Sequence, residues 1–349
     1  MRGGLRSRLW AGLDVGTFSV KLIGHYPLGG VARSPRAEVP LPPSENGPPN
    51  PEIVARAIAE CFTRTNVSPR SVRGLTLGVS GPDVIVKQIS LPLLADEEVG
   101  PALRFEARKH LPFDLQSMVI DFQILGRYLT EKRLDVLVAA VPQERLARAL
   151  APLKALGIEP DIVDAAPLAL TNGLAAVREN DRDACVLLDI GHASSHLTLY
   201  QKSEPYFSRR LEFGGLTLTQ AIAHDTRVPL EEAEEWKLAA GSDEPGFRVD
   251  WNSVEMQAVL ECLKRDLVED LRRSFAFYRT MGHLPDPLRM WISGGSARLP
   301  GLSARLAELL GFPVMLFNPL HRHGEEPAGD TVGTGPQFAQ AFGLAQRGA

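Results

Sequence analysis

The sequence predicts an α/β protein built from two similar halves, and three observations lead to that class. Apolar runs bounded by turn signals, which are typical of buried strands, alternate with helix-like segments along the 349 residues. Two strand–turn–strand segments, residues 12–23 (GLDVGTFSVKLI) and 186–200 (VLLDIGHASSHLTLY), share one motif. In each, an aspartate is followed two places later by glycine and then by small polar residues. Because the copies lie far apart in the chain, they indicate two similar domains that face each other.

Both turns have residues suited to holding an anion. Gly191 permits a tight turn where a Cβ would clash or block close approach of the backbone, and the N–H groups of such a turn can cradle an anion. Asp14 and Asp189 stand at the mouths of the turns, where a carboxylate can hold hydrated Mg²⁺ against phosphate oxygens. A single copy is equally well explained as a hairpin with a polar tip. The repeat favours the phosphate interpretation.

Composition narrows the class of protein. Apolar content of 44% and charged content of 23% are ordinary for a globular chain, and a net charge of −4 gives no reason to expect nucleic acid as a partner. The three cysteines, Cys61, Cys185 and Cys262, are widely spaced and predict reduced core residues of a cytosolic protein. No run approaches the ~18–20 apolar residues of a membrane span, so we expect no transmembrane anchor.

The first half combines short strands with a proline-rich stretch. Residues 35–51 hold seven prolines, which excludes a central strand or a helix there and favours a surface loop. Pro51 suits the first turn of a helix with an apolar face that includes Ile58 and Phe62. Strands are expected at residues 12–26, 30–34 (around a turn at Leu28-Gly29-Gly30), 74–80, 83–91 and 158–163, and a further helix at 167–178.

A compact α+β insert is expected at residues 89–155. Asp96 is a suitable cap for a helix that ends at the corner Leu111-Pro112-Phe113. Strands at 118–128 and 134–141 follow, and then a helix at 143–156 that Pro152 should kink or split.

The charged stretch 179–183 is the natural boundary before the second half. That half is expected to hold strands at 186–200 (the second hairpin), 206–213, 288–292 and 314–317, and helices at 216–224, 229–240, 253–281, 302–310 and 336–347.

Two glycine pairs and one charged pair complete the set of candidate site residues. Gly214-Gly215 and Gly294-Gly295 each follow a strand and precede a helix, where free N–H groups can meet an anion or a ribose edge. Glu234 and Lys237 are three residues apart and share a helix face. Singly, the glycines are explained as tight turns, the charged pair as a solvated face and Lys21 as a surface lysine. Their order along the chain is far more specific.

That order resembles the nucleotide site of actin-like ATPases, a duplicated, ribonuclease H-like α/β fold around a nucleotide cleft. By this resemblance ATP and Mg²⁺ are the cofactors, and Asp14 and Asp189 hold Mg²⁺ through water. The remaining roles that the resemblance implies are phosphate contacts for Gly16, Thr17, Ser19, Lys21, Gly191 and Ser194, ribose and adenine contacts for Glu234 and Lys237, and adenosine-flanking positions for Gly294 and Gly295. Gly214 and Gly215 are expected to bind the nucleotide as well.

The connecting stretches resemble one family more closely, the type IV pilus assembly protein PilM. The resemblance rests on residues 103–125 (LRFEARKHLPFDLQSMVIDFQIL), 136–146, 291–314 and 336–347 and on the Phe213-Gly214-Gly215 turn, and it covers nearly the whole chain. It implies the extra α+β domain that PilM shares with the cell-division protein FtsA. The implied subdomains are 1A (9–88 and 156–182), 1C (89–155), 2A (183–226 and 286–349) and 2B (227–285).

The resemblance also implies a partner. In PilM, a groove between the first subdomain and its insert holds a short N-terminal peptide of the inner-membrane protein PilN. Leu111, Pro112 and Phe113 lie in the matching insert, although the corner is equally well explained as core. We therefore expect a cytoplasmic protein that does not insert into the membrane and is recruited to it by a PilN-like partner. Contacts with other pilus platform proteins are expected, and self-association is left open.

Three residues depart from the family pattern. Phe18 and His192 replace small residues at the two turns, and Ala166 stands before Pro167, where ATPases of the superfamily tend to carry glutamate. An alanine cannot orient an attacking water, so hydrolysis is expected to be slow or absent. Asp164, two residues earlier and on the same face of an extended segment, is an alternative for that role.

The sequence also bears on two other functions of the same superfamily. An FtsA-like filament protein tethered to membrane should end in a basic amphipathic helix, whereas this tail (QFAQAFGLAQRGA) has one arginine and a modest apolar face. A sugar or acid kinase needs a catalytic carboxylate that faces a substrate pocket, and the sequence places none.

Overall fold

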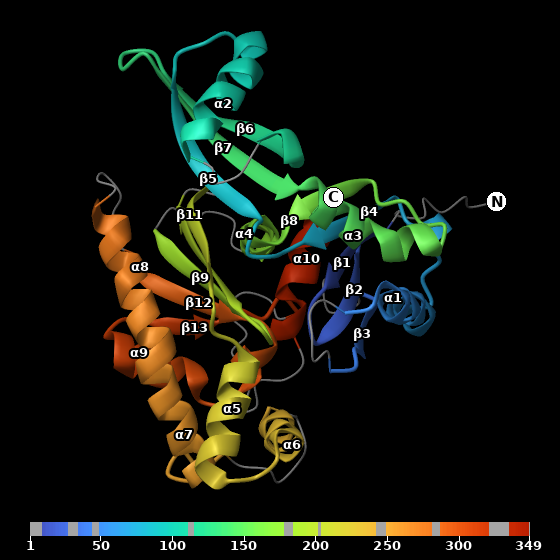
Figure 1. The fold of residues 1–349 in the computed structure, drawn as a ribbon, viewed down its shortest axis with the longest axis vertical. Coiled ribbons are helices and arrows are strands. Elements are labelled where there is room, and N and C mark those ends of the chain that lie inside the picture. The colour runs from blue at the N-terminus through green and yellow to red at the C-terminus, as the bar shows by residue number, and fades with distance from the viewer. Residues whose placement is uncertain are drawn as a thin grey trace, which may run out of the picture.

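The structure is a computed structural model that describes residues 9–26, 34–43, 49–110, 115–177, 184–201, 204–241, 249–280, 287–320 and 335–348. The predicted turn at residues 28–30, the corner at 111–113 and the boundary at 179–183 lie outside these residues. The described strands form a five-stranded sheet, ordered β3-β2-β1-β4-β8, and an eight-stranded sheet, ordered β13-β12-β9-β10-β11-β5-β7-β6. Figure 1 shows the insert at the top and the two halves side by side below it.

The first half is built on the five-stranded sheet. Its strands are β1 (Trp10–Val15), β2 (Ser19–His25), β3 (Arg36–Pro40), β4 (Gly74–Val79) and β8 (Ile162–Ala165). β1 and β2 are antiparallel, whereas β4 runs parallel to both β1 and β8. α1 (Pro51–Thr65) and α3 (Gln143–Ala155) pack on it through an apolar core that includes Ile58, Phe62 and Leu153.

Two expectations for this half are corrected. The strand that pairs with β2 is β3 at Arg36–Pro40, within the stretch predicted to be a loop. Proline is tolerated there because β3 is at the edge of its sheet, with Pro35 before it and Pro40 as its last residue. α3 also runs unsplit through Pro152, which is buried beside Leu153 in the contact with α1, so packing outweighs the missing N–H of the proline.

The insert has its own sheet and core. β5 (Ile85–Pro92), β6 (Met118–Tyr128) and β7 (Arg133–Pro142) pair in antiparallel order, with α2 (Asp96–His110) packed on them and a short 3₁₀ turn, η3 (Leu115–Ser117), before β6. β5 pairs with β7 along its whole length, so this strand belongs with the insert from Ile85 onward. Phe207 of β11 pairs with Lys87 of β5, which joins the insert sheet to the sheet of the second half.

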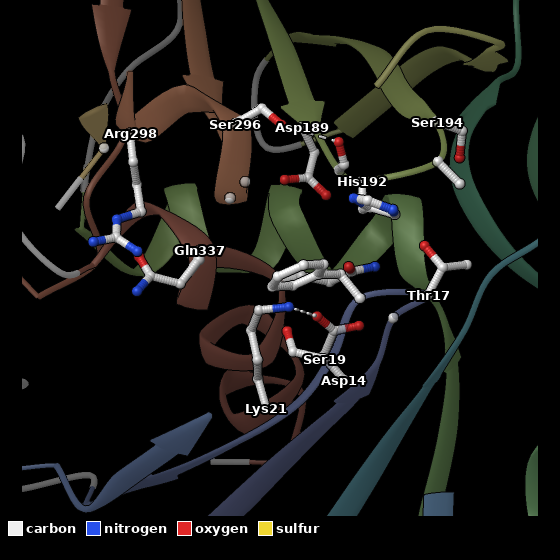
Figure 2. A pocket seen from close by; sticks show the side chains of 18 of the residues that line it. Asp14, Thr17, Ser19, Lys21, Asp189, His192, Ser194, Ser296, Arg298 and Gln337 are labelled. Atoms are coloured by element: carbon white, nitrogen blue, oxygen red, sulfur yellow. Dashed lines mark hydrogen bonds and ion pairs between the residues drawn. The ribbon is translucent and has the colours of Figure 1, made fainter. Parts of the chain in front are cut away.

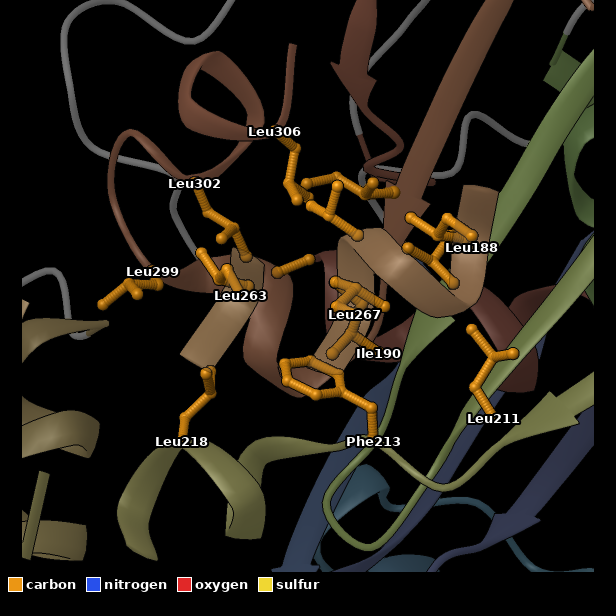
Figure 3. Packing of buried hydrophobic residues seen from close by; sticks show 14 of the residues in the cluster. Leu188, Ile190, Leu211, Phe213, Leu218, Leu263, Leu267, Leu299, Leu302 and Leu306 are labelled. Carbon is orange, nitrogen blue, oxygen red and sulfur yellow. The ribbon is translucent and has the colours of Figure 1, made fainter. Parts of the chain in front are cut away.

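The second half carries most of the helices. Its strands are β9 (Cys185–Ile190), β10 (Ser195–Gln201), β11 (Glu204–Leu211), β12 (Arg289–Ser293) and β13 (Val314–Leu316). Its helices are α5 (Gly215–Thr226), α6 (Leu230–Ala240), α7 (Val254–Cys262), α8 (Glu269–Thr280) and α9 (Leu302–Leu310). The single helix predicted at 253–281 contains a π-helical segment, η4 (Leu263–Val268). Leu263 and Leu267 of that segment lie in the core beside Phe213 and Ile190 (Figure 3).

Two helices cross between the halves and hold them together. α4 (Ala166–Val177) follows a first-half strand, yet its Leu170 and Leu174 pack on Cys185 and Leu187 of the second sheet. α10 (Ala339–Gln346), at the end of the second half, packs on β1 and β2 of the first sheet. The helices meet closely, since a Cβ on Gly343 would lie 1.6 Å from the carbonyl oxygen of Ala169. None of the described helices is long and apolar enough to cross a bilayer.

Candidate functional site

A cavity of about 170 Å³ lies between the halves and is lined by both aspartate-bearing turns. Figure 2 shows Asp14, Ser19 and Lys21 on one side of it and Asp189, His192 and Ser296 on the other. Every residue predicted to hold nucleotide lines this cavity except Gly214 and Gly215. The lining residues from that prediction are Asp14, Gly16, Thr17, Ser19, Lys21, Asp189, Gly191, Ser194, Glu234, Lys237, Gly294 and Gly295.

The two turns have the same backbone geometry. The N–H of Gly16 donates to the carbonyl of Ser19 at 3.0 Å, and that of Gly191 donates to the carbonyl of Ser194 at 3.1 Å. Strand register then places Lys21 opposite Asp14, and His196 opposite Asp189. The sequence repeat is therefore a repeat of structure.

Carboxylates outnumber cations around the first turn. The ammonium of Lys21 lies 3.5 Å from Asp14 Oδ2, and the hydroxyl of Ser19 donates to Glu38 Oε1 at 2.7 Å. Burial raises the pKa of Asp14, and the charge of Asp189 adds to the rise while Lys21 opposes it. Burial lowers the pKa of Lys21, but Asp14, Glu38 and Asp189 together hold it above its usual value. One lysine thus faces three carboxylates.

Asp189 is held by groups of its own half. The hydroxyl of Ser293 donates to Asp189 Oδ1 at 3.1 Å, which opposes the rise in the pKa of Asp189 that burial causes. Gly294 comes next and has a φ of +92°, and a Cβ there would lie 2.7 Å from Asp189 Oδ1 and 2.4 Å from the carbonyl oxygen of Ile190. Glycine is therefore required at position 294 by both backbone angle and space. Ser296 donates to the carbonyl of Gly191 at 3.2 Å, which ties the glycine-rich segment to the turn.

The predicted charged pair is formed on α6. Lys237 Nζ donates to Glu234 Oε2 at 2.7 Å, to Thr219 Oγ1 at 2.7 Å and to the carbonyl of Gly215 at 2.8 Å. Burial lowers the pKa of Lys237, which Glu234 opposes. Both residues line the cavity, so they form one wall of it as well as an ion pair.

Gly214 and Gly215 lie at the start of α5 and contact the second turn. The N–H of Gly215 donates to the carbonyl of Gly191, and that of Leu216 donates to the carbonyl of His192, each at 2.8 Å. These N–H groups are therefore not free for a ligand, contrary to the expectation for this helix start. These two hydrogen bonds hold the second turn against the start of α5.

Several residues that line the cavity were missed in the sequence. They are Glu38, His196, Arg298, Gln337 and Gln340. His196 could have been found, because it follows Asp189 at the same seven-residue spacing as Lys21 follows Asp14. Glu38 lies in the proline-rich stretch that the sequence predicts to be a surface loop. The Nε of Arg298 is buried and has no hydrogen-bond partner among the described residues, and the side chain lies beside Gln337 (Figure 2).

Asp164 is not brought to the cavity lining. It is 8% exposed, its Oδ2 lies 3.4 Å from Arg347 Nε, and Asn172 donates to the same oxygen at 3.5 Å. Burial raises the pKa of Asp164, and the charge of Arg347 opposes the rise. This carboxylate therefore links β8 to the end of the chain after α10.

Comparison with solved structures supports the fold. The PilM–PilN type IV pilus biogenesis complex matches with a TM-score of 0.78 and 29% identity over 97% of this chain and 98% of that one. The ethanolamine utilization protein EutJ from Carboxydothermus hydrogenoformans matches with a TM-score of 0.55 and 13% identity, over 98% of this chain and 90% of that one. The second likeness shows the fold alone. Together with the repeated turns, these matches identify two actin-like halves with a PilM-type insert.

Comparison of sequences gives relatives and a family. Cell division protein FtsA of Borreliella burgdorferi is 23% identical over 195 residues, which are 50% of this chain and 45% of that protein. The Bacillus subtilis FtsA is 26% identical over 180 residues, 47% of this chain and 40% of that protein. The matched stretches thus span less than half of each relative. The family model for type IV pilus assembly protein PilM matches residues 12–349, so the chain belongs to the PilM family of actin-like pilus assembly proteins.

Proposed function

We propose that this protein is an ATP-binding scaffold of type IV pilus assembly, in which MgATP binds in the cavity and clamps the two halves together. The observation that carries the nucleotide site is the convergence of both aspartate-bearing turns on one cavity. A ligand held by both turns stabilises the closed arrangement by mass action.

The charges of the site suit a divalent cation. Asp14, Glu38 and Asp189 face one ammonium, Lys21, so the group carries excess negative charge when its carboxylates are ionised. Buried charge is costly unless it is paired, and oxygen ligands of this kind suit Mg²⁺. Asp14 and Asp189 are the residues that would hold the ion, which when bound neutralises phosphate charge.

The two ends of the cavity suit the two ends of a nucleotide. Gly16, Thr17, Gly191 and Ser194 form turns whose backbone donors suit phosphates. At the other end, Arg298 has a buried Nε without a partner among the described residues, and Gly294 and Gly295 also line the cavity. Glu234 and Lys237 form the wall that suits a ribose.

Calorimetry with and without Mg²⁺ tests this site. The expected result is saturable binding of ATP that is lost when EDTA removes the cation. Binding that does not depend on Mg²⁺, or no binding at all, would contradict it.

The partner is proposed from the solved relative. That structure is a complex of PilM with PilN, and this chain aligns with 97% coverage, insert included. We propose a PilN-like N-terminal peptide as the ligand of the groove between subdomain 1A and the insert, which would recruit a cytoplasmic protein to the inner membrane. An extended peptide would form main-chain hydrogen bonds with the groove and place a few of its side chains in pockets. The proposed groove residues Leu111, Pro112 and Phe113 lie outside the described residues.

The partner has its own experiment. A synthetic peptide from the N-terminus of the neighbouring PilN-like protein should bind the purified protein, and bare lipid vesicles should not pellet it. Sedimentation with vesicles in the absence of the peptide would contradict recruitment through a partner.

Hydrolysis is proposed to be slow or absent. Ala166 is 2% exposed at the start of α4, and Asp164 is engaged by Arg347 and Asn172. Neither residue therefore presents a free polar group to a water at the phosphates. Phosphate release at about 1 s⁻¹ or faster, an ordinary enzyme rate, would contradict the proposal that ATP holds the halves together without being hydrolysed.

The division into subdomains is proposed with both boundaries of 1C adjusted. Subdomains 2A and 2B keep the boundaries expected from sequence. Subdomain 1C would run from Ile85, where β5 begins to pair with β7, to Pro142, because α3 packs with α1 in the core of subdomain 1A. Limited proteolysis that releases a fragment beginning near residue 85 would support this boundary.

A further inference from the structure

The two turns carry bulky rings that touch. The centroids of the Phe18 and His192 rings are 5.1 Å apart and their planes are inclined by 40°. Phe18 belongs to the first half and His192 to the second, and both line the cavity. The rings therefore make a direct contact between the halves at the tips of the turns proposed to hold phosphates.

The cavity is small for its proposed ligand. Its volume of about 170 Å³ is below the ~300–1,000 Å³ of ordinary ligand pockets. Phosphates held by both turns would have to lie between them, which is where the two rings meet. The turns must therefore separate, or the rings must swing away, before a nucleotide can bind.

The ring contact is a contact between uncharged groups. Burial lowers the pKa of His192, and the charge of Lys237 lowers it further, so the imidazole is neutral at pH 7. The remaining charged neighbour that acts on it, Glu234, is already paired with Lys237 at 2.7 Å. The contact is therefore one of tilted aromatic rings rather than of an ion pair.

We propose that Phe18 and His192 form an aromatic latch that closes the nucleotide site and has to open before the phosphates can bind. This inference rests on the proposed nucleotide site and adds the residues that gate it. If only the open state binds, the apparent affinity is reduced by the fraction of molecules that are open. An aromatic pair of this kind shifts such an equilibrium by about two- to twelvefold.

The test measures binding of a fluorescent ATP analogue with Mg²⁺ by stopped flow and calorimetry. Phe18→Ser and His192→Ser should each raise the association rate constant and the affinity by about two- to tenfold. The double variant should gain no more than the better single variant, because either change opens the latch. Phe277→Ser is the matched control, since it removes the Phe207–Phe277 contact, at 5.8 Å, from outside the cavity lining, and it should leave binding unchanged.

Hydrogen exchange of the nucleotide-free protein gives a second measurement. Phe18→Ser should raise exchange at both turns, residues 16–19 and 191–194, since the contact joins them. Exchange that rises throughout the chain would indicate unfolding of that variant. The same measurement on His192→Ser would then test whether loss of the contact raises exchange at both turns.

The outcomes separate the latch from the nucleotide site. If wild type binds MgATP and the serine variants bind it equally or more weakly, the latch proposal is wrong and the nucleotide-site proposal is supported. If neither wild type nor the variants bind MgATP, the nucleotide proposal fails and the latch falls with it.

Discussion

The first and second aspartate-bearing turns have the same backbone and different electrostatics. Each joins two antiparallel strands, and each closes with the same glycine hydrogen bond. The first turn has a cation at the cross-strand position, Lys21, which lies 3.5 Å from Asp14. The second has His196 there, whose pKa falls to about 4 through burial and the charge of Arg210. Asp189 instead receives a hydrogen bond from Ser293.

This difference teaches that the repeat preserves the backbone cradle but not the charge of each half. The first turn supplies a fixed ammonium, and the second supplies a carboxylate held by a neutral hydroxyl. Only together do the two halves offer both aspartates, Asp14 and Asp189, that are proposed to hold Mg²⁺. The halves are therefore not interchangeable, and four predictions follow from comparing them.

The largest effect is expected from Asp189→Ala. Loss of the carboxylate to which Ser293 donates a hydrogen bond should weaken Mg²⁺-dependent ATP binding by more than about 100-fold. Contacts with charged groups contribute about 1.5–3 kcal/mol each, and the ion is lost with them. The melting temperature without nucleotide should change little, because burial already raises the pKa of this carboxylate. Calorimetry measures the affinity. Glu212→Ala, at a side chain 76% exposed, is the control, and equal affinity of wild type and Asp189→Ala would refute the site.

The cross-strand residues give the sharpest comparison. Lys21→Met should weaken MgATP binding about 10–100-fold, as expected for a lost charge-assisted contact. His196→Met, at the matching position of the second turn, removes a neutral ring and should change the affinity by less than about threefold, well under one such contact. Both are measured in the same titration. Similar losses in the two variants would show that the two positions have the same role.

The pH dependence of stability should distinguish the turns as well. The pKa of His196 is about 4 in the folded protein, below its ordinary value of 6.5, so the unfolded chain binds a proton first as the pH falls. Its contribution therefore destabilises the fold progressively from about pH 6.5 to 4, by about 3 kcal/mol at the lower end. His196→Asn should remove that part of the slope, whereas Lys21→Met should not. Urea unfolding at pH 7 and at pH 4 measures the difference, and parallel curves for wild type and His196→Asn would contradict it.

The smallest effect concerns the turn glycines. A Cβ on Gly191 would lie 2.7 Å from the carbonyl oxygen of Ser194, but a Cβ on Gly16 would lie 3.2 Å from that of Ser19. Gly191→Ala should therefore lower the free energy of unfolding by about 1 kcal/mol more than Gly16→Ala, a modest share of the range for overpacking. Urea midpoints of the two variants test this. A larger loss in Gly16→Ala would reverse the ranking of the turns.

The sequence by itself determined the elements that local patterns encode. The Asp-x-Gly repeat predicted two matching turns because a tight hairpin needs glycine and small residues within a few positions. The apolar face of α1 and the bounds of β6 and β7 also depend on neighbours in the chain, and both were predicted within a few residues. The fold class and the family could be predicted from these patterns, and the structure and comparisons confirmed them.

Tertiary structure decided everything that depends on which elements meet. Sheet position, which no local pattern encodes, made β3 an edge strand in a proline-rich stretch and brought Glu38 to the cavity. Burial let Pro152 stay inside α3, and it placed Asp164 beside Arg347 rather than in the cavity lining. The contact of Phe18 with His192 joins residues from opposite halves, whose relative position depends on the packing of α4 and α10 across them. Local periodicity specifies elements, whereas distances between distant side chains follow from packing of the whole chain.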